Sequence, residues 1–534
     1  MSPHASALAG AVVALRRKAA LAGLLALALL AGCAMLPADV QRPTSAALAD
    51  VSRTALADIA QASTPQDKRG LSGFRLLPDG AEGLAARQAL LHLAQKSLGV
   101  QYYLIAADDT GRQFLRALRD AAQRGVRVRL LVDDLHADAS DELFAALAAH
   151  PNVQVRLFNP LPVRSGSRTT RVLFSLHDFD RINRRMHNKL FIADNTFAVT
   201  GGRNVADEYF MRGSAANFID TDVLSAGPVV RDLSSVFDSF WNSELAFPIG
   251  TLGASDLAPS AARDRFDALV GSAGAAHPST ATRIDEQLKT GRLDLTFAAV
   301  QVFADVPAKA AGAGVGDAAG SAPGPMGTAM QGTLALLRSA RSEVLIASPY
   351  FIPGQRGLEL MREARDDGVR ISVLTNSLAA TDEPLAHWGY ARYRKAMLKM
   401  GVDLSELSPT RIRQAGMLGN FSSSLGRLHA KLAVVDRRWL MVGSMNMDLR
   451  SSRSNTELGL AIDSPELAAE AASLLEQHWV SSNYRLRIGN GSERIEWIAA
   501  EDDGEVVHAA EPHTDWLLRF RLGLLSMFVS EDLL

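Results

Sequence analysis

The chain of 534 residues has a single cysteine, few lysines and no excess of charge of either sign. One cysteine excludes an internal disulfide and a cysteine-rich metal site. Because 56 Lys and Arg stand against 58 Asp and Glu, the charge gives no global reason to expect nucleic-acid binding. With 47% hydrophobic and 21% charged residues, the composition excludes a mainly disordered chain and a polytopic membrane protein.

One run of apolar or small residues, Ala19–Leu30, follows the basic cluster Arg16, Arg17 and Lys18. It is too short to span a bilayer and is typical of a secretory signal. The run leads to Gly32-Cys33, which resembles a bacterial lipoprotein signal with the only cysteine as the lipidated residue. We therefore expect a signal peptide over 1–32 and a lipid anchor at Cys33, on the periplasmic side of the inner or outer membrane. A plain signal peptide with an incidental cysteine is the alternative.

Two long stretches of the chain resemble each other and predict a duplicated α/β architecture. Helical and strand patterns alternate in both, and Gly125 and Gly368 begin matching strands 243 residues apart. An offset of that size indicates an internal duplication and not a short-period solenoid. We expect a tether over 33–69, a first half over 70–255, a connecting region over 256–330 with an Ala/Gly-rich linker, and a second half over 331–534.

The most informative residues form the pattern H-x-K-x4-D, which occurs once in each half. His187, Lys189 and Asp194 form the first copy, and His429, Lys431 and Asp436 form the second, in register with the duplication. On a strand the histidine and the lysine share a face, whereas the odd spacing turns the aspartate to the other face. The two His–Lys pairs are therefore expected to be catalytic, and Asp194 and Asp436 to be structural.

Small residues and carboxylates follow each motif at similar distances. We expect phosphate oxygens to be bound by two glycine-containing turns and the asparagines after them, namely Gly201, Gly202 and Asn204 in the first half and Gly443, Ser444 and Asn446 in the second. Asp222 and Glu457 are expected to accept hydrogen bonds from Nδ1 of the histidines and to fix their tautomers. Such a set suits phosphoryl chemistry in which one histidine attacks phosphorus and the other protonates the leaving alcohol, without a metal or other cofactor.

These paired motifs make the chain similar to the phospholipase D superfamily over roughly residues 70–534. The resemblance implies two pseudo-symmetric α/β halves, each a mixed sheet flanked by helices, with a shared active site and a phosphohistidine intermediate. Within the superfamily the chain resembles the bacterial cardiolipin synthase C-type branch, through Gln101-Tyr102-Tyr103, Arg184–Lys189, Asp207–Phe210 and Gly443–Ser451. A departure is Leu104-Ile105, where that branch leads us to expect a tryptophan and a histidine.

The resemblance implies a phosphatidyltransferase that makes cardiolipin from phosphatidylglycerol and a phosphatidyl donor, either phosphatidylglycerol or phosphatidylethanolamine. By family habit His187 would be the nucleophile and His429 the acid. A membrane-anchored phospholipase or phosphodiesterase that uses water is the alternative, and a nuclease is a weaker one, since removal of the signal lowers the formal charge from −2 to −5. Phospholipids and a membrane are the expected partners, without nucleic acid, and the oligomeric state stays open.

The C-terminal segment Trp516–Leu534 is strongly apolar and admits two interpretations. It could lie on a bilayer surface, or it could dock onto the core of the protein itself.

Overall fold

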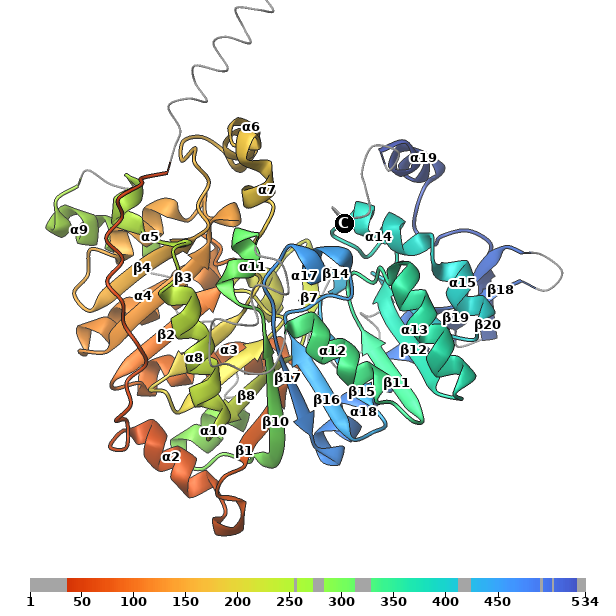
Figure 1. The fold of residues 1–534 in the computed structure, drawn as a ribbon, viewed down its shortest axis with the longest axis horizontal. Helices are drawn as coiled ribbons and strands as arrows, with labels where there is room; N and C mark the ends of the chain where they lie inside the picture. Colours follow the sequence, from red (N-terminus) through yellow and green to blue (C-terminus); the bar gives the residue numbers. More distant parts are fainter. Residues whose placement is uncertain are drawn as a thin grey trace, which may run out of the picture.

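A computed structural model describes residues 36–253, 257–271, 283–312, 328–411, 424–489, 493–501 and 504–525. Residues 1–32, where a signal peptide is expected, and Cys33 lie outside the described residues. Two α/β halves stand side by side in it (Figure 1). Among the helices described, none is both long and apolar enough to cross a membrane.

The first half is a mixed sheet whose order is β9-β4-β3-β2-β5-β6-β8-β1. Its strands are β1 (Ser72–Leu77), β2 (Ser97–Tyr102), β3 (Arg127–Asp133), β4 (Val153–Phe158), β5 (Leu190–Ala193), β6 (Phe197–Gly201), β8 (Asp222–Ala226) and β9 (Ala246–Pro248). Its helices are α3 (Gly80–Leu93), α4 (Asp109–Gln123), α5 (Asp141–Leu147), α6 (Arg168–Phe174), α7 (Phe179–Ile182) and α8 (Val229–Trp241). Strands β2, β3 and β4 are parallel, as their βα connections require.

The second half repeats this order as β18-β13-β12-β11-β15-β16-β17, with β19 and β20 added beyond β18. Its strands are β11 (Glu343–Ala347), β12 (Arg370–Asn376), β13 (Asp403–Leu407), β15 (Leu432–Val435), β16 (Trp439–Gly443), β17 (Leu458–Asp463), β18 (Asn483–Ile488), β19 (Ile495–Glu501) and β20 (Gly504–His508). Its helices are α12 (Ala329–Arg338), α13 (Gly354–Asp366), α14 (Pro384–Ala391), α15 (Arg394–Lys399), α17 (Leu449–Arg453), α18 (Pro465–Ser481) and α19 (Trp516–Leu525). The duplication predicted from the sequence is therefore present in the strand order.

The helices form because apolar residues recur at helical spacing behind good N-caps. In α4 the Asp108 carboxylate accepts the N–H of Gly111 and caps the first turn, and Phe114, Leu115 and Leu118 turn one face to the sheet. On the other face of the sheet, α8 covers the first half and α18 covers the second. The apolar side chains of both helices belong to one core that continues from one half to the other. That common core is what fixes the two halves against each other.

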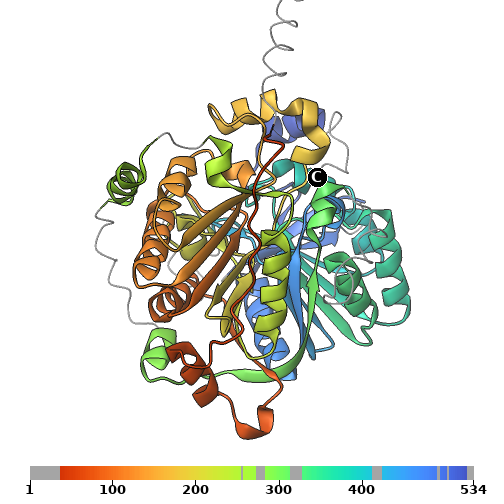
Figure 2. The same cartoon turned by 60° about the vertical axis from the view of Figure 1, so that its left-hand side comes forward.

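The described part of the connecting region expected over 256–330 forms helices and a strand that pack on both halves, and residues 313–327 of its Ala/Gly-rich linker lie outside the described residues. Helices α9 (Pro259–Val270) and α10 (Arg283–Lys289) pack on the first half, and β10 (Thr296–Ala304) pairs with both half-sheets. Ser72–Phe74 of β1 pair with its beginning, and Leu458–Asp463 of β17 pair with Ala299–Ala304. One continuous 18-stranded sheet results, and Figure 2 shows β10 running between its two parts. Helix α11 (Pro307–Ala311) follows β10.

Residues 36–69 also differ from the expected tether, because they are packed against the first half. The side chain of Arg129 donates to the carbonyl of Ser45, and that of Arg156 donates to the carbonyl of Pro43. Helix α2 (Ala55–Ser63) buries Leu56 and Ile59 in the core. The prolines and small polar residues of 36–69 therefore belong to a surface segment that buried arginines hold against the first half. They do not form a free linker.

The two halves are also joined by backbone hydrogen bonds next to each motif. Strand β7 (Ala216–Ile219) of the first half pairs in parallel with β14 (Leu425–Leu428) of the second, and the carbonyl of Ile219 accepts the N–H of His429. On the other side, the N–H of His187 donates to the carbonyl of Thr456. Each histidine is thus positioned by backbone from the opposite half.

Candidate active site

Both histidines lie immediately before the central strands β5 and β15. The segments Leu190–Ala193 and Leu432–Val435 are apolar and fully buried, which anchors the motifs between neighbouring strands. His187 and His429 are each less than a tenth exposed, and Lys189 and Lys431 are buried with them. The two copies of the motif thus meet at the junction of the halves.

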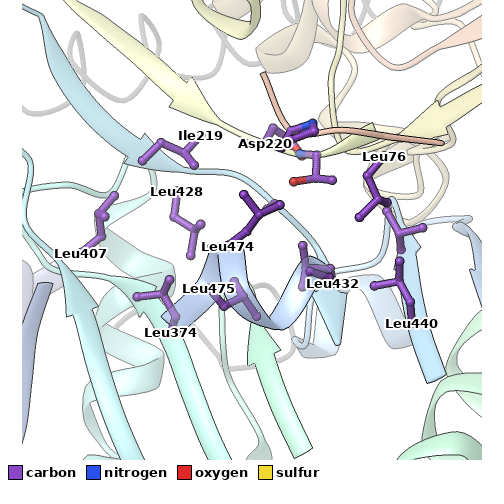
Figure 3. Close-up of a pocket in the computed structure, with 15 residues that line it drawn as sticks. Leu76, Ile219, Asp220, Leu374, Leu407, Leu428, Leu432, Leu440, Leu474 and Leu475 are labelled. Carbon is purple, nitrogen blue, oxygen red and sulfur yellow. The ribbon is translucent and has the colours of Figure 1, made fainter. Parts of the chain in front are cut away.

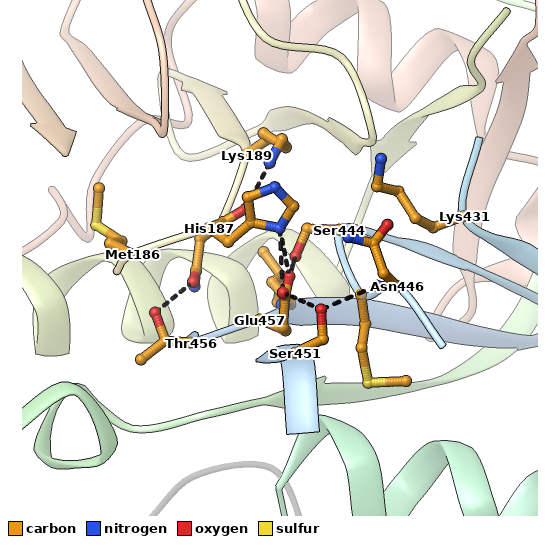
Figure 4. A network of polar contacts seen from close by, with 12 residues as sticks. Met186, His187, Lys189, Lys431, Ser444, Asn446, Ser451, Thr456 and Glu457 are labelled. Carbon is orange, nitrogen blue, oxygen red and sulfur yellow. Dashed lines mark hydrogen bonds and ion pairs between the residues drawn. The ribbon is translucent and has the colours of Figure 1, made fainter. Parts of the chain in front are cut away.

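His187 is oriented by a carboxylate from the second half. Its Nδ1 lies 3.0 Å from both carboxylate oxygens of Glu457. The hydroxyls of Ser444 and Ser451 donate to the same carboxylate at 2.5 and 2.9 Å. Figure 4 shows Glu457 and the two serines on one side of the His187 ring. This contact leaves Nε2 of His187 as the ring nitrogen able to meet a substrate.

His429 is oriented by a carboxylate from the first half, but this carboxylate is Asp220 and not the expected Asp222. The Asp220 Oδ2 to His429 Nδ1 distance is 2.6 Å. The histidine–carboxylate pairs are therefore crossed, since each joins a histidine of one half to an acid of the other.

Asp222 instead balances two buried arginines. Its Oδ2 lies 2.9 Å from Nη1 of Arg87 and 3.3 Å from Nη1 of Arg203. All three side chains are almost completely buried. The expected catalytic role of Asp222 is wrong, because its carboxylate is taken up by ion pairs that hold α3 to the strands.

Sheet register explains the error. Gly201 pairs with Asp222, whereas Gly443, its counterpart, pairs with Gly459. Asp220 and Glu457 each lie two residues before these partners, so they are structural equivalents. Aligning the halves on Thr221 and Thr456 matches Asp222 to Glu457 and is two residues out of register.

The two lysines make similar backbone contacts and repel each other, and Lys431 Nζ also lies 2.9 Å from Nδ1 and 3.1 Å from Nε2 of the His429 ring. Lys189 Nζ donates to the carbonyl of His187 at 2.8 Å, and Lys431 Nζ donates to that of His429 at 2.6 Å. Burial and then the charge of Lys431 lower the pKa of Lys189 well below its usual value. Burial lowers the pKa of Lys431 to about 8, although the carboxylates of Asp220 and Glu457 oppose the shift. Two cations held in this way can stabilise an anionic phosphoryl group.

Burial favours the neutral form of both histidines in the free protein. It lowers the pKa of His187 to about 4, against the raising effect of Glu457. Burial and the charge of Lys431 lower the pKa of His429 well below its usual value. A bound phosphate would oppose this shift, because its negative charge favours the protonated ring.

The environments of the two carboxylates differ. Apolar side chains surround a cavity of about 40 Å³ beside Asp220, among them Leu428 and Leu432, as Figure 3 shows. Burial raises the pKa of Asp220, while the charges of Lys431 and Arg203 act against this. Burial acts to raise the pKa of Glu457 as well, but interactions with His187, Lys189 and Ser444 together lower the pKa of that carboxyl. Glu457 is thus the better-stabilised anion of the two.

The glycine turns make room for neighbouring backbone and carboxylates. A Cβ on Gly202 would lie 2.2 Å from Oδ1 of Asp220, and one on Gly201 would lie 2.4 Å from Oδ1 of Asp222. One on Gly443 would lie 2.3 Å from the carbonyl of Leu458. Ser444 holds Glu457, as described above. These four residues therefore shape the site, and their contact with phosphate stays a prediction.

The two asparagines lie at the site but differ in their contacts. Asn204 Nδ2 donates to the hydroxyl of Tyr209 at 2.9 Å. Oδ1 of Asn446 is buried without a hydrogen-bond partner, and Figure 4 shows the side chain beside Lys431. Of the pair, Asn446 has the more available amide for a phosphate oxygen.

Asp194 and Asp436 hold corresponding turns, away from the histidines. The Asp194 carboxylate accepts backbone N–H groups of Gln95, Lys96 and Ser97. That of Asp436 accepts those of residues 341–343. Each therefore fixes the turn between a helix and the first parallel strand of its half.

Several contributing residues were not singled out from the sequence. The Asp133 carboxylate accepts the N–H of Met186, and Oδ1 of Asn376 accepts the N–H of Leu428, one residue before each histidine. Asp133 and Asn376 are 243 residues apart, the same offset as the duplication, and this correspondence could have identified them from the sequence.

Aromatic rings also pack on the histidines. The Tyr103 ring centroid is 5.1 Å from that of His187, and the Tyr209 ring is 5.1 Å from that of His429. Across the described residues, no group of three or more His, Cys, Asp or Glu side chains is arranged to hold a metal ion.

Comparison with known proteins agrees with this geometry. The family described as "Cardiolipin synthase, PLD-like domain" matches residues 88–241 and 333–479, one segment in each half. Cardiolipin synthase C of Escherichia coli (strain K12) is 36% identical over 87% of this chain and 97% of its own length. A cardiolipin synthase of Alkalihalophilus pseudofirmus is 24% identical over 72% of this chain and 62% of its own length.

A solved structure supports the fold. The crystal structure of phosphatidylserine synthase from Haemophilus influenzae Rd KW20 superposes with a TM-score of 0.52 at 13% identity, covering 87% of this chain and 96% of that one. At this identity the likeness concerns the arrangement of the two halves alone.

Proposed function

The chain belongs to the phospholipase D superfamily, with domains of the cardiolipin synthase type, and we propose that it transfers a phosphatidyl group onto phosphatidylglycerol to make cardiolipin. The crossed His187–Glu457 and His429–Asp220 pairs carry this proposal. They supply two imidazoles, each with one ring nitrogen fixed by a carboxylate, beside two lysines. Such a set is suited to displacement at phosphorus through a covalent intermediate.

In the first step Nε2 of His187 attacks the phosphorus of the donor lipid. The P–O bond to the headgroup alcohol breaks, and Nε2–H of protonated His429 gives its proton to that oxygen. The product is a phosphatidyl group on His187 and a free alcohol. Glu457 stabilises the positive charge that develops on His187, and its lowered pKa makes it the better anion for this task.

In the second step the acceptor replaces the departed alcohol. Neutral His429 takes the proton of a phosphatidylglycerol hydroxyl, the resulting oxygen attacks phosphorus, and the P–N bond to His187 breaks. Lys189, Lys431 and the Asn446 amide stabilise the phosphoryl oxygens in both steps. The donor is phosphatidylglycerol or phosphatidylethanolamine. If water took the acceptor position, the product would be phosphatidic acid.

Purified, detergent-solubilised protein should be given labelled phosphatidylglycerol with and without phosphatidylethanolamine, and the lipids resolved. Cardiolipin made by the intact enzyme, and not by His187→Ala or His429→Ala, is the expected result. A requirement for phosphatidylethanolamine would identify the donor. Phosphatidic acid as the sole product would contradict the transferase proposal.

The order of the two histidines needs its own test. Acid-labile label from the donor should be trapped on His187 in a His429→Ala background. This variant lacks the base that takes the proton of the acceptor hydroxyl, so the intermediate is consumed slowly. Label on His429 in the wild-type chain would reverse the assignment.

We further propose that the mature chain begins at Cys33 and is held at a membrane by its lipid. This rests on the sequence alone, through the basic cluster, the apolar run and the position of the only cysteine. Incorporation of labelled fatty acid into the intact chain and its loss in Cys33→Ala is the test.

A further inference from the structure

Large apolar side chains are exposed on two helical segments, one from each half. In the first half, Leu173 of α6 is 59% exposed, and Leu176, between α6 and α7, and Phe179, the first residue of α7, are also exposed. In the second half α19 exposes six large apolar side chains, including Trp516 at 70% and Phe520 at 63%. Only Leu522 of this helix is buried. A soluble protein rarely exposes so many large apolar side chains on neighbouring segments without a partner.

The two segments project from the same end of the molecule. Figures 1 and 2 both show α6, α7 and α19 at this end and α2 at the opposite one. The first described segment of the chain also starts at this end (Figure 1), and it follows Cys33 by three residues in the sequence. We call the exposed residues of α6, α7 and α19 the apolar face. A lipid anchor at Cys33 would bring this face toward the bilayer.

Short contact paths join each segment to the catalytic histidine of its own half. Arg168, the first residue of α6, lies with its Nη1 2.6 Å from Nδ1 of His136. Nε2 of His136 lies 2.9 Å from the hydroxyl of Tyr103, whose ring packs on His187. The α6 segment therefore stands at the rim of the site.

The path from α19 is similar. Glu511, five residues before α19, lies 3.3 Å from Nε2 of His387 in α14. Nδ1 of His387 lies 3.1 Å from the carbonyl of Asn376, which holds Leu428 next to His429. The apolar face thus flanks the site from both halves, as a surface must if lipid is to leave a bilayer and reach the histidines.

Charge on the apolar face also fits lipid. Arg519 and Arg521 lie within α19 among its exposed apolar residues, and neither makes an ion pair in the described structure. Arginines can extend their guanidinium groups to phosphate headgroups while their aliphatic stems cover apolar surface. Trp516 at the start of the helix is the residue type enriched at membrane interfaces.

We propose that the apolar face inserts into the interfacial layer of a phospholipid bilayer and presents the active site to it. The inference deepens the proposed function and rests on it for the identity of the lipid. Insertion itself does not require turnover, so the two can fail separately.

The test places a fluorophore at chosen positions of the full-length chain. Leu173→Cys and Phe520→Cys report on the apolar face, and Gln61→Cys on the exposed side of α2 is the matched control. The parent chain without an added cysteine serves as the blank. The protein is reconstituted with vesicles of phosphatidylglycerol and phosphatidylethanolamine that contain brominated lipid, also in a His187→Ala background.

Quenching at Leu173→Cys and Phe520→Cys, with none at Gln61→Cys, is expected in both backgrounds. Equal fluorescence at all three positions would overturn the proposal. So would a stable dimer in lipid-free solution in which the labels at 173 and 520 are shielded, because the occupant would then be a second copy of the chain.

A second measurement separates docking from catalysis. Phe520→Ser with Leu524→Ser should lower turnover of phosphatidylglycerol in vesicles about tenfold, whereas turnover of a monomeric short-chain phosphatidylglycerol stays within about twofold. Val506→Ser with Val507→Ser on β20, where the side chains are 43% and 45% exposed, is the control and should change neither rate. Equal losses on both substrates would contradict a role at the membrane.

Discussion

At the scale of single residues, two aspartates two positions apart do different work. Asp220 holds Nδ1 of His429 at 2.6 Å, and Asp222 balances Arg87 and Arg203. Both are buried carboxylates, so composition and burial do not separate them. Their partners separate them, because Asp220 binds a titratable imidazole and Asp222 binds two permanently charged guanidinium groups.

Replacing each aspartate by asparagine should therefore affect different properties, catalysis for Asp220 and stability for Asp222. Asp220→Asn should lower kcat by about 10²–10⁴-fold with little change in stability, since the histidine loses its tautomer and orientation. Asp222→Asn should destabilise the protein by about 3–5 kcal/mol, because two buried guanidinium groups lose their counter-charge. Initial rates and denaturant unfolding measure both effects. Similar stability losses in the two variants would contradict the division of roles.

The pH dependence should be set by a histidine and a lysine. His187 must be neutral to attack, so kcat/KM should fall as the pH drops through its pKa of about 4. Lys431 must be charged to stabilise phosphate, so kcat/KM should fall as the pH rises through its pKa of about 8.

The matched variant for the basic limb is Lys431→Arg. Because arginine keeps its charge well above this range, the basic limb should move upward in pH if activity survives. An unchanged basic limb in an active Lys431→Arg variant would assign that limb to another group. The profile is measured with a monomeric substrate, so that membrane binding does not enter.

At the scale of secondary-structure elements, the hairpins β6–β8 and β16–β17 decide which acid reaches which histidine. The turn after β6 can approach Asp220 only because Gly202 has no side chain, since a Cβ would come within 2.2 Å of Oδ1. The backbone register of the hairpins then sets the positions of Asp220 and Glu457.

Gly202→Ala should accordingly displace Asp220 and lower kcat by at least about tenfold, the effect of roughly 1.4 kcal/mol on the barrier. Gly459→Ala in β17 is the control, because its nearest neighbour to a new Cβ is 3.7 Å away, an ordinary contact. Rates and thermal unfolding of both variants give the comparison. Full activity in Gly202→Ala would show that the position of Asp220 tolerates a shift.

At the scale of the whole molecule, the site exists only where the halves meet. Each histidine takes both its backbone and its carboxylate partner from the other half. Strand β10 and the core shared by α8 and α18 hold this junction. We therefore expect the two halves to behave as one cooperative unit.

Denaturant unfolding should show one transition in which far-UV circular dichroism and tryptophan fluorescence coincide. Gln301→Pro in the middle of β10 should lower stability and activity together, because proline disrupts the ladder to β17. Gln301→Ala is the control and should retain both, since this side chain is exposed. Two separate transitions in the unmodified chain would mean that the halves fold independently.

The sequence by itself determined the duplication, the α/β class and the two H-x-K-x4-D motifs. These follow from local periodicity and from a constant offset, which need no knowledge of distant contacts. Asp194 and Asp436 hold backbone turns, which fits the structural role expected of them, but they do so from turns after β5 and β15 and not from a strand face.

Only the tertiary structure decided that Asp220 and not Asp222 meets a histidine, that the pairs are crossed between halves, and that β10 and residues 36–69 belong to the folded body. Two residues of one parity share a face, so periodicity cannot distinguish Asp220 from Asp222, whereas hairpin register does. The crossed histidine–carboxylate pairs and the pairing of β10 with both half-sheets depend on how the two halves pack against each other. That packing is the sum of many weak contacts between residues far apart in the chain, and no local pattern encodes it.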